Sequence, residues 1–153
     1  MSSKGKANMV DISEKVPVRR QATATGIIRL KASTINLLKL GKIEKGDVFA
    51  VARIAAIMAA KRTSEAIPLC HPIPLEQVSA DFEVEPESVR ATVTVKASGK
   101  TGVEMEALHG LSLALLTIWD MTKGYEKDEA GQYPNTSIQH LRVQEKLKSG
   151  DQA

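Results

Sequence analysis

The sequence predicts an α+β fold, a ferredoxin-like split β-α-β sandwich in which helices cover one face of an antiparallel sheet. Two alternating apolar runs, residues 78–84 and 89–97, are separated by a short polar turn and predict a β-hairpin. Residues 103–122 are largely apolar and predict a long buried helix. Together with one earlier strand, two earlier helices and one late strand, the order becomes β-α-α-β-β-α-β, which fits that architecture.

The N-terminal half supplies the first strand and two helices. Residues 21–30 are rich in threonine and isoleucine with partial alternation, and they predict a strand. Ser33 or Thr34 is the expected N-cap of a short helix that ends at Gly41. Asp47 is the expected N-cap of the next helix, whose small apolar residues form a broad face. Its alanines would let another helix or a sheet approach closely.

The C-terminal half supplies the hairpin, the long helix and the last strand. Residues 85–88, Glu-Pro-Glu-Ser, form the hairpin turn, and the glycines of residues 99–102 end the second hairpin strand. The helix that follows is apolar nearly all round, which predicts burial on several sides and in part at a subunit interface. A loop around Gly131 and Pro134 precedes a last strand at residues 138–143.

Length and composition fit one domain. The chain has 153 residues, of which 42% are hydrophobic and 25% charged, as is usual for globular proteins. We expect a single domain at residues 9–147, a disordered tail at 1–8 and a C-terminal tail at 148–153. No apolar run approaches the ~18 residues of a membrane span, so no membrane partner is expected. One cysteine excludes a disulfide within these residues and suits the reducing cytoplasm, the expected location.

The charge is slightly basic. A net charge of +3 and a pI near 9.0 are compatible with an anionic small molecule and give weak support to nucleic-acid binding. RNA-recognition modules stack bases on aromatic residues of their sheet strands. Only Phe82 among the aromatic residues falls in a predicted strand. No nucleic-acid partner is therefore expected.

Residues 67–74, Ile-Pro-Leu-Cys-His-Pro-Ile-Pro, form a rigid and apolar segment. Its prolines fix φ and remove backbone donors, so neither an ordinary helix nor a central strand can run through it. Its other residues include a thiol, Cys70, and an imidazole, His71, in place of the glycine and serine of a solvated loop. We expect it to form one wall of a pocket, although a connector that only covers the core is the alternative. Adjacent Cys and His side chains generally diverge, so the pair does not predict a protease dyad.

Residues 99–107 combine a glycine-flanked turn with two carboxylates. The Gly-Lys-Thr sequence at 99–101 is not a P-loop, because that motif requires a glycine where Thr94 stands. The turn leads into a helix N-terminus, which could hold an anion or be an ordinary strand–helix connection. Glu104 and Glu106 would point ~200° apart on a regular helix, so both cannot face one pocket from within the helix, and the alternative is that one of them still belongs to the loop at the first turn. Acidic residues at this end also suit the helix dipole, which is the simpler explanation.

Asp120 and Lys123 share a helix face at i, i+3. They form either a surface ion pair worth well under ~1 kcal/mol or an acid–base pair tuned by burial and mutual charge. An aspartate near the C-terminal end of a helix runs against the dipole preference. Glu106 lies ~21 Å from Asp120 along the helix axis, at 1.5 Å per residue. One small reaction centre cannot touch both, so either the substrate is long or another subunit completes the site.

Basic side chains occur around the second helix and near the N-terminus. They are Arg20, Lys45, Arg53, Lys61 and Arg62. Such residues usually form a solvated helix face, and binding of an anionic substrate is the alternative.

Six short motifs occur in one order along the chain. They are KGDVF at 45–49, ARIA at 52–55, AAKRT at 59–63, IPLCHP at 67–72, GKTGVEMEA at 99–107 and DMTK at 120–123. Together they closely resemble the MoaC family, the cyclic pyranopterin monophosphate synthases of molybdenum-cofactor biosynthesis. The resemblance runs from about Met9 to Asp128. Several unrelated motifs in the correct order and spacing make it far more specific than any one of them.

The resemblance implies a phosphorus–oxygen lyase that acts after a radical enzyme. Such a lyase converts 3′,8-cyclo-7,8-dihydro-GTP to cyclic pyranopterin monophosphate and releases pyrophosphate. The domain at residues 9–147 would then be catalytic. The resemblance also implies a ferredoxin-like subunit and a homohexamer, a trimer of dimers, with the site at the dimer interface.

Position by position, the resemblance assigns catalytic roles to Asp120, Lys123 and Lys45. The residues that it assigns to substrate binding are Leu69, Cys70, His71, Met105 and Glu106, and more weakly Glu104, Arg20, Arg53, Lys61 and Lys127. A lysine base would need its pKa lowered from ~10.4 by neighbouring cations or by desolvation. Lys45 and the arginines would neutralise the triphosphate and the departing pyrophosphate.

This chemistry requires no redox cofactor and no tightly held metal, and it leaves room for a magnesium ion carried on the triphosphate. Glu106 and His109 have the spacing of a di-metal motif, but such sites need the motif twice, so no metal site is predicted. After Asp128 the chain departs from the glycine-, serine- and lysine-rich tail of bacterial members, and Lys146 or Lys148 could replace its phosphate contacts. The alternative function is a non-catalytic nucleotide-binding subunit, which would not need the aspartate–lysine pair.

Overall fold

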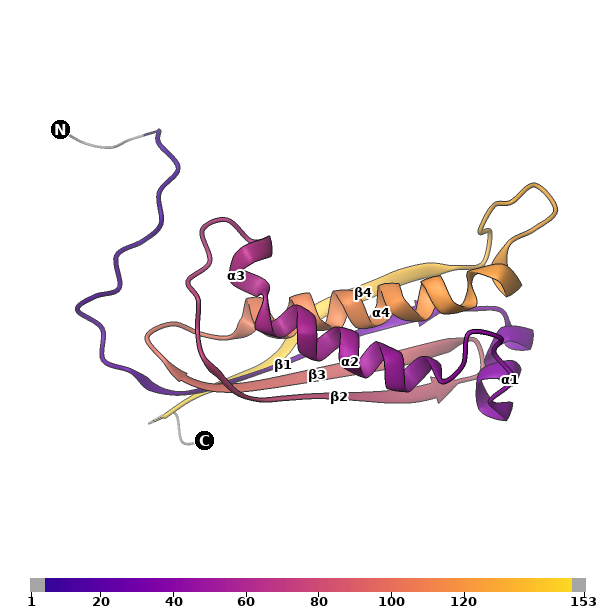
Figure 1. The fold of residues 1–153 in the computed structure, drawn as a ribbon, viewed down its shortest axis with the longest axis horizontal. Helices are drawn as coiled ribbons and strands as arrows, with labels where there is room; N and C mark the ends of the chain where they lie inside the picture. The colour runs from indigo at the N-terminus through magenta and orange to yellow at the C-terminus, as the bar shows by residue number, and fades with distance from the viewer. Residues whose placement is uncertain (1–4, 150–153) are drawn as a thin grey trace.

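The computed structural model describes residues 5–149 as a four-stranded antiparallel sheet with helices on one face (Figure 1). The strands are β1 (Val18–Arg29), β2 (Leu75–Glu85), β3 (Ser88–Gly99) and β4 (Ser137–Lys148), in the order β2-β3-β1-β4. The helices are α1 (Ala32–Leu40), α2 (Val48–Lys61), α3 (Thr63–Ala66) and α4 (Glu104–Glu126). These findings confirm the predicted α+β class and the ferredoxin-like arrangement. Only the short α3 was not predicted.

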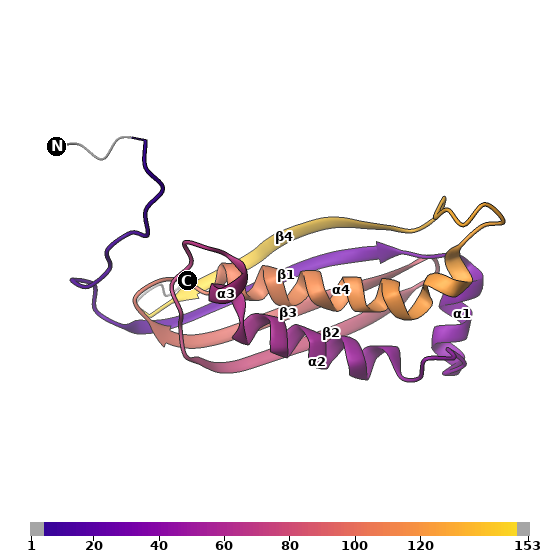
Figure 2. The ribbon, with the colours of Figure 1, turned by 45° about the horizontal axis from the view of Figure 1, so that its top comes forward.

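The core lies between the sheet and the two long helices, α2 and α4, which run side by side across it (Figures 1 and 2). Alternate residues of β1 and β3, such as Ala24 and Val93, are buried, as is Leu111 on α4. A Cβ atom at Gly110 of α4 would lie 2.9 Å from the carbonyl oxygen of Ala56 on α2. The small residues of α2 therefore allow the close helix approach that the sequence predicts.

Several local features that the sequence predicts are found in the structure. The Asp47 carboxylate accepts a hydrogen bond from the Ala50 N–H at 3.0 Å and so caps α2. Gly41 ends α1 with φ 64°, a left-handed conformation that glycine adopts without strain. The hairpin turn falls between Glu85 and Ser88, as predicted.

The expected N-cap of α1 at Ser33 or Thr34 is wrong. The helix begins at Ala32, and no local side chain caps it. The Lys31 N–H donates instead to both carboxylate oxygens of Glu126, at 3.1 and 3.2 Å, and the Thr34 hydroxyl donates to the same carboxylate. A carboxylate at the end of α4 therefore replaces the local cap, and no pattern around α1 indicates it.

The predicted tails at 1–8 and 148–153 include residues 1–4 and 150–153, which lie outside the described residues. Residues 5–17 form no helix or strand. This segment contacts the main body where His71 Nε2 lies 2.7 Å from the Val10 carbonyl oxygen and where Lys100 donates to the Ser13 carbonyl at 3.0 Å. Between residues 5 and 149, no helix is long and apolar enough to cross a bilayer.

Replacing the fully buried Glu126 by alanine is expected to lower the free energy of unfolding by about 3–5 kcal/mol. The substitution removes the acceptor for the Lys31 N–H and for the hydroxyls of Thr34 and Thr136, and it leaves the two hydroxyls buried without this partner. Urea denaturation measures the loss. The exposed Glu129 is the control, and its change to alanine should cost less than about 0.5 kcal/mol. Equal stabilities of the two variants would show that the buried carboxylate contributes nothing.

Candidate active site

Helix α4 carries candidate residues at both of its ends. It has 23 residues and is therefore ~35 Å long. Its first turn lies near α3, and its last turn lies near α1 (Figure 1). The candidate residues accordingly form two clusters, one at each end of the helix.

The first cluster surrounds Asp120, which lies between two ammonium groups. Lys123 Nζ is 2.9 Å from Asp120 Oδ1, and Lys45 Nζ is 3.0 Å from Asp120 Oδ2. Lys45 also donates to the Asp120 backbone carbonyl at 3.1 Å. Lys45 comes from the loop between α1 and α2, so the fold brings the three predicted catalytic residues into contact. Their side chains are 44–57% exposed, as a site open to a substrate or a partner requires.

The charges of this cluster favour the ionised forms of Asp120 and Lys123. Hydrogen bonds from Lys123 and Lys45 lower the pKa of the Asp120 carboxyl, and the Asp120 carboxylate raises the pKa of Lys123. The lowered pKa that a lysine base would need is therefore not found at Lys123. The reason is that the nearest charge to Lys123 is a carboxylate and that this exposed side chain is little desolvated. At neutral pH Asp120 is therefore a carboxylate and Lys123 an ammonium ion.

The second cluster lies around the first turn of α4. The proline-rich segment, the Gly102 turn and β4 line a groove of about 580 Å³. Its residues include Leu69, Cys70, His71, Glu104, Met105, Val143 and Lys146. The centre of the proline-rich segment, Leu69 to His71, thus forms one wall of the groove, as the sequence predicts. Behind the groove, the Cys70 thiol donates to Glu106 Oε1 at 3.9 Å.

Glu106 is buried, and its Oε2 has no hydrogen-bond partner within residues 5–149. Burial raises the pKa of Glu106, and the charge of Glu104 adds to this effect. Burial and then Glu106 raise the pKa of Cys70, so the sulfur is a neutral thiol and a poor nucleophile at neutral pH. Both groups suit the binding of a polar ligand better than covalent catalysis.

Glu104 and Glu106 point to different surroundings, as their spacing predicts. Glu104 forms an ion pair with Lys146 of β4 at 3.1 Å, and its carboxylate lies over Gly102. This contact places Lys146 at the groove.

Comparison with known proteins decides the family. The family model for the MoaC family matches residues 9–149. The chain belongs to the MoaC family. It is 57% identical to a probable cyclic pyranopterin monophosphate synthase of Methanosarcina mazei, covering 94% of this chain and 92% of that protein. It is 56% identical to a protein of the same name from Archaeoglobus fulgidus, covering 95% and 94%.

A third MoaC relative carries a different name. The protein from Methanothermobacter thermautotrophicus is named a probable cyclic pyranopterin monophosphate synthase accessory protein. It is 58% identical over 92% of this chain and 88% of its own length.

The remaining residues assigned from the MoaC resemblance are dispersed. Arg20 donates to the Gly99 carbonyl at 3.2 Å, next to the Gly102 turn. Lys127 follows α4 and lies 6.0 Å from the ring centre of Tyr133, near the Asp120 cluster. Arg53 donates to the Ala80 carbonyl at 3.0 Å, and Lys61 lines a separate groove beside the start of β2. The last two belong to neither cluster within one chain.

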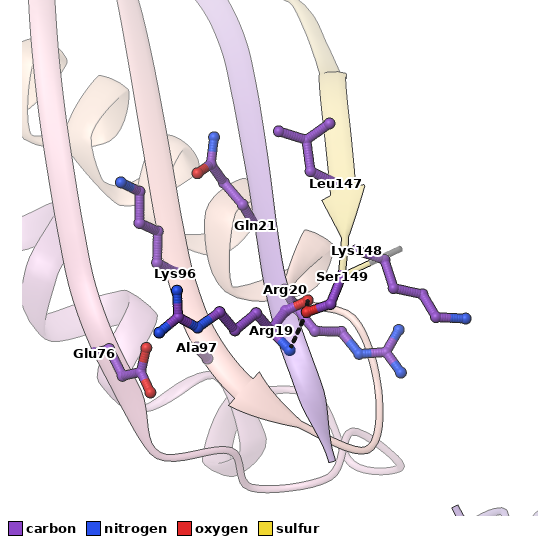
Figure 3. Close-up of a pocket in the computed structure, with 9 residues that line it drawn as sticks. All are labelled: Arg19, Arg20, Gln21, Glu76, Lys96, Ala97, Leu147, Lys148 and Ser149. Atoms are coloured by element: carbon purple, nitrogen blue, oxygen red, sulfur yellow. Dashed lines mark hydrogen bonds between the residues drawn. The ribbon is translucent and has the colours of Figure 1, made fainter. Parts of the chain in front are cut away.

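A further basic groove of about 480 Å³ lies at one end of the sheet (Figure 3). It is lined in part by Arg19, Arg20, Lys96 and Lys148. Within residues 5–149, no group of three His, Cys, Asp or Glu side chains is arranged to hold a metal ion.

Tyr125 contacts the loop of residues 42–46, the Lys45 loop, and the sequence did not predict this contact. Its hydroxyl oxygen accepts a hydrogen bond from the Glu44 N–H at 2.8 Å. No local signal could reveal a contact between residues 81 positions apart.

Proposed function

We propose that the chain is a cyclic pyranopterin monophosphate synthase, which converts 3′,8-cyclo-7,8-dihydro-GTP to cyclic pyranopterin monophosphate and pyrophosphate. The observation that carries the proposal is the contact of Asp120 with both Lys45 and Lys123, in a chain that belongs to the MoaC family. A surface ion pair consists of one carboxylate and one ammonium group. Here a second ammonium group, that of Lys45, contacts the same carboxylate, and together the three groups can exchange protons with a substrate and neutralise its phosphate charge.

The proposed roles follow from the charges of the two clusters. Asp120 accepts a proton and Lys123 donates one while the purine-derived rings open and close. Lys45 neutralises phosphate charge as pyrophosphate leaves. Oε2 of Glu106, which is buried and has no hydrogen-bond partner among the described residues 5–149, binds a polar group of the substrate beside Cys70 and His71.

A second copy of the chain would complete the site. The two clusters are separated by most of the length of α4, and a two-fold axis can bring the last turn of one α4 near the first turn of another. Exposed apolar side chains support an interface on the helices: Val51, Ile54 and Met58 share one face of α2, and Leu116 lies on α4. We propose a homohexamer built as a trimer of dimers, with the site at the dimer interface.

The proposed reaction takes place in the cytoplasm, where Cys70 stays reduced. It uses no redox cofactor and no resident metal, and a magnesium ion would arrive on the triphosphate of the substrate.

The test is an assay of the purified chain with 3′,8-cyclo-7,8-dihydro-GTP, with and without EDTA. We expect pyrophosphate and the cyclic phosphate product in equal amounts, and retained activity in EDTA. Release of pyrophosphate in EDTA supports a site that needs no metal. Loss of activity in EDTA, with recovery on adding Mg²⁺, assigns a role to the metal-bound substrate. Binding of the substrate without release of pyrophosphate would favour the non-catalytic alternative.

A further inference from the structure

The Lys45 loop, residues 42–46, connects α1 to α2 and is largely exposed. Only Ile43 of the loop is buried. Inside the loop the Gly46 N–H donates to the Ile43 carbonyl at 3.0 Å. A long lysine side chain loses substantial rotamer freedom when it is held in one place, so its contact with Asp120 depends on how well the loop backbone is fixed.

The Tyr125 hydroxyl holds the backbone of this loop by a hydrogen bond. Its oxygen accepts the Glu44 N–H at 2.8 Å, one residue before Lys45. Within the described residues 5–149, no other hydrogen bond joins the backbone of residues 43–46 to a side chain outside the loop. The bond therefore connects the backbone beside Lys45 to α4, the helix that carries Asp120.

Tyr125 itself is firmly placed. Its ring packs against the core, and its carbonyl accepts a hydrogen bond from Lys31 Nζ at 3.2 Å. The next residue, Glu126, is fully buried and bound to α1 and to Thr136. Figure 2 shows α1 and the last turn of α4 at the same end of the molecule. These contacts with the core, α1 and Thr136 hold the residue that carries the hydroxyl.

We propose that the Tyr125 hydroxyl positions Lys45 for its contact with Asp120. Tyr125 is a positioning residue, which acts through Lys45 and does not touch the reacting atoms. The inference deepens the proposed function and rests on it for the catalytic meaning of the contact. The contact itself can be measured without substrate.

The first experiment is a pH titration of the Asp120 carboxyl carbon by ¹³C NMR in the folded protein. The charged groups that face Asp120 are Lys123 on α4 and Lys45 on the loop. Since Lys45 lowers the pKa of Asp120, loosening the loop by Tyr125→Phe should raise that pKa. In a Lys45→Ala background, the same Tyr125→Phe change should have no further effect. An unchanged pKa in the single variant, or an equal rise in both backgrounds, would overturn the proposal.

The second experiment is kinetic. Tyr125→Phe should lower kcat about fivefold, the factor expected for the net effect of one hydrogen bond, with little change in KM. This loss should vanish in the Lys45→Ala background. Thr94→Val is the matched control, because it removes a hydroxyl that shares one hydrogen bond with Thr23 at 3.0 Å in the sheet, outside both clusters, and it should leave kcat unchanged. If the wild type is inactive, the proposed function fails, whereas the NMR titration still decides the positioning role.

Discussion

Replacing Asp120 by asparagine is expected to lower kcat by about 10²–10⁴-fold, the range that a positioned acid or base contributes. An amide has nearly the same shape as the carboxylate but cannot accept a proton at neutral pH. It also leaves Lys45 and Lys123 without the negative charge that lies between them. Because the Asp120 side chain is 57% exposed, the stability of the fold should change little. Steady-state rates of pyrophosphate release measure the effect.

The matched control is Asp81→Asn on the exposed edge strand β2. It makes the same chemical change outside both clusters and should keep wild-type kcat. Circular dichroism and thermal unfolding should show that both variants are folded. An Asp120→Asn variant that retains activity within tenfold of wild type would remove Asp120 from proton transfer.

The order of elements was predictable because it depends on local periodicity. The alternating residues on either side of Pro86 predict two strands with one buried face, and the apolar residues after Gly102 predict a buried helix. Few sheet topologies can connect these elements, so the strand order is strongly limited. The end of α1 was predictable for the same reason, since Gly41 acts within its own turn. Its beginning was not, because the acceptor for the Lys31 N–H belongs to Glu126, 95 residues away.

The candidate site was predictable in part. Helix geometry alone separates Asp120 from Glu106, whatever the rest of the fold does. The i, i+3 spacing also places Asp120 beside Lys123, whose pKa it raises. The second ammonium group at Asp120 required the tertiary structure, because Lys45 lies 75 residues away in the chain. The place of Tyr125 beside the Lys45 loop also required the tertiary structure.

A mixture of two inactive variants is expected to recover about a quarter of wild-type activity if each site takes one cluster from each chain. The variants are Asp120→Asn and Glu106→Gln. Glutamine has the shape of the protonated carboxyl that the buried position of Glu106 favours, so the fold should persist. Random pairing makes half of the dimers hybrids. In each hybrid one site carries both substitutions and the other carries neither, so about one site in four is intact.

The matched control mixes Asp120→Asn with Lys123→Ala. Both substitutions lie in the same cluster, so every site of a hybrid dimer keeps one of them and no activity should return. Co-expression of differently tagged chains and purification through both tags shows that hybrids have formed. If hybrids of Asp120→Asn and Glu106→Gln stay as inactive as the control, the two clusters do not meet across an interface. The ~21 Å between them on one helix would then have to be spanned by the substrate within a single chain, so this experiment decides which of the two explanations for that distance is correct.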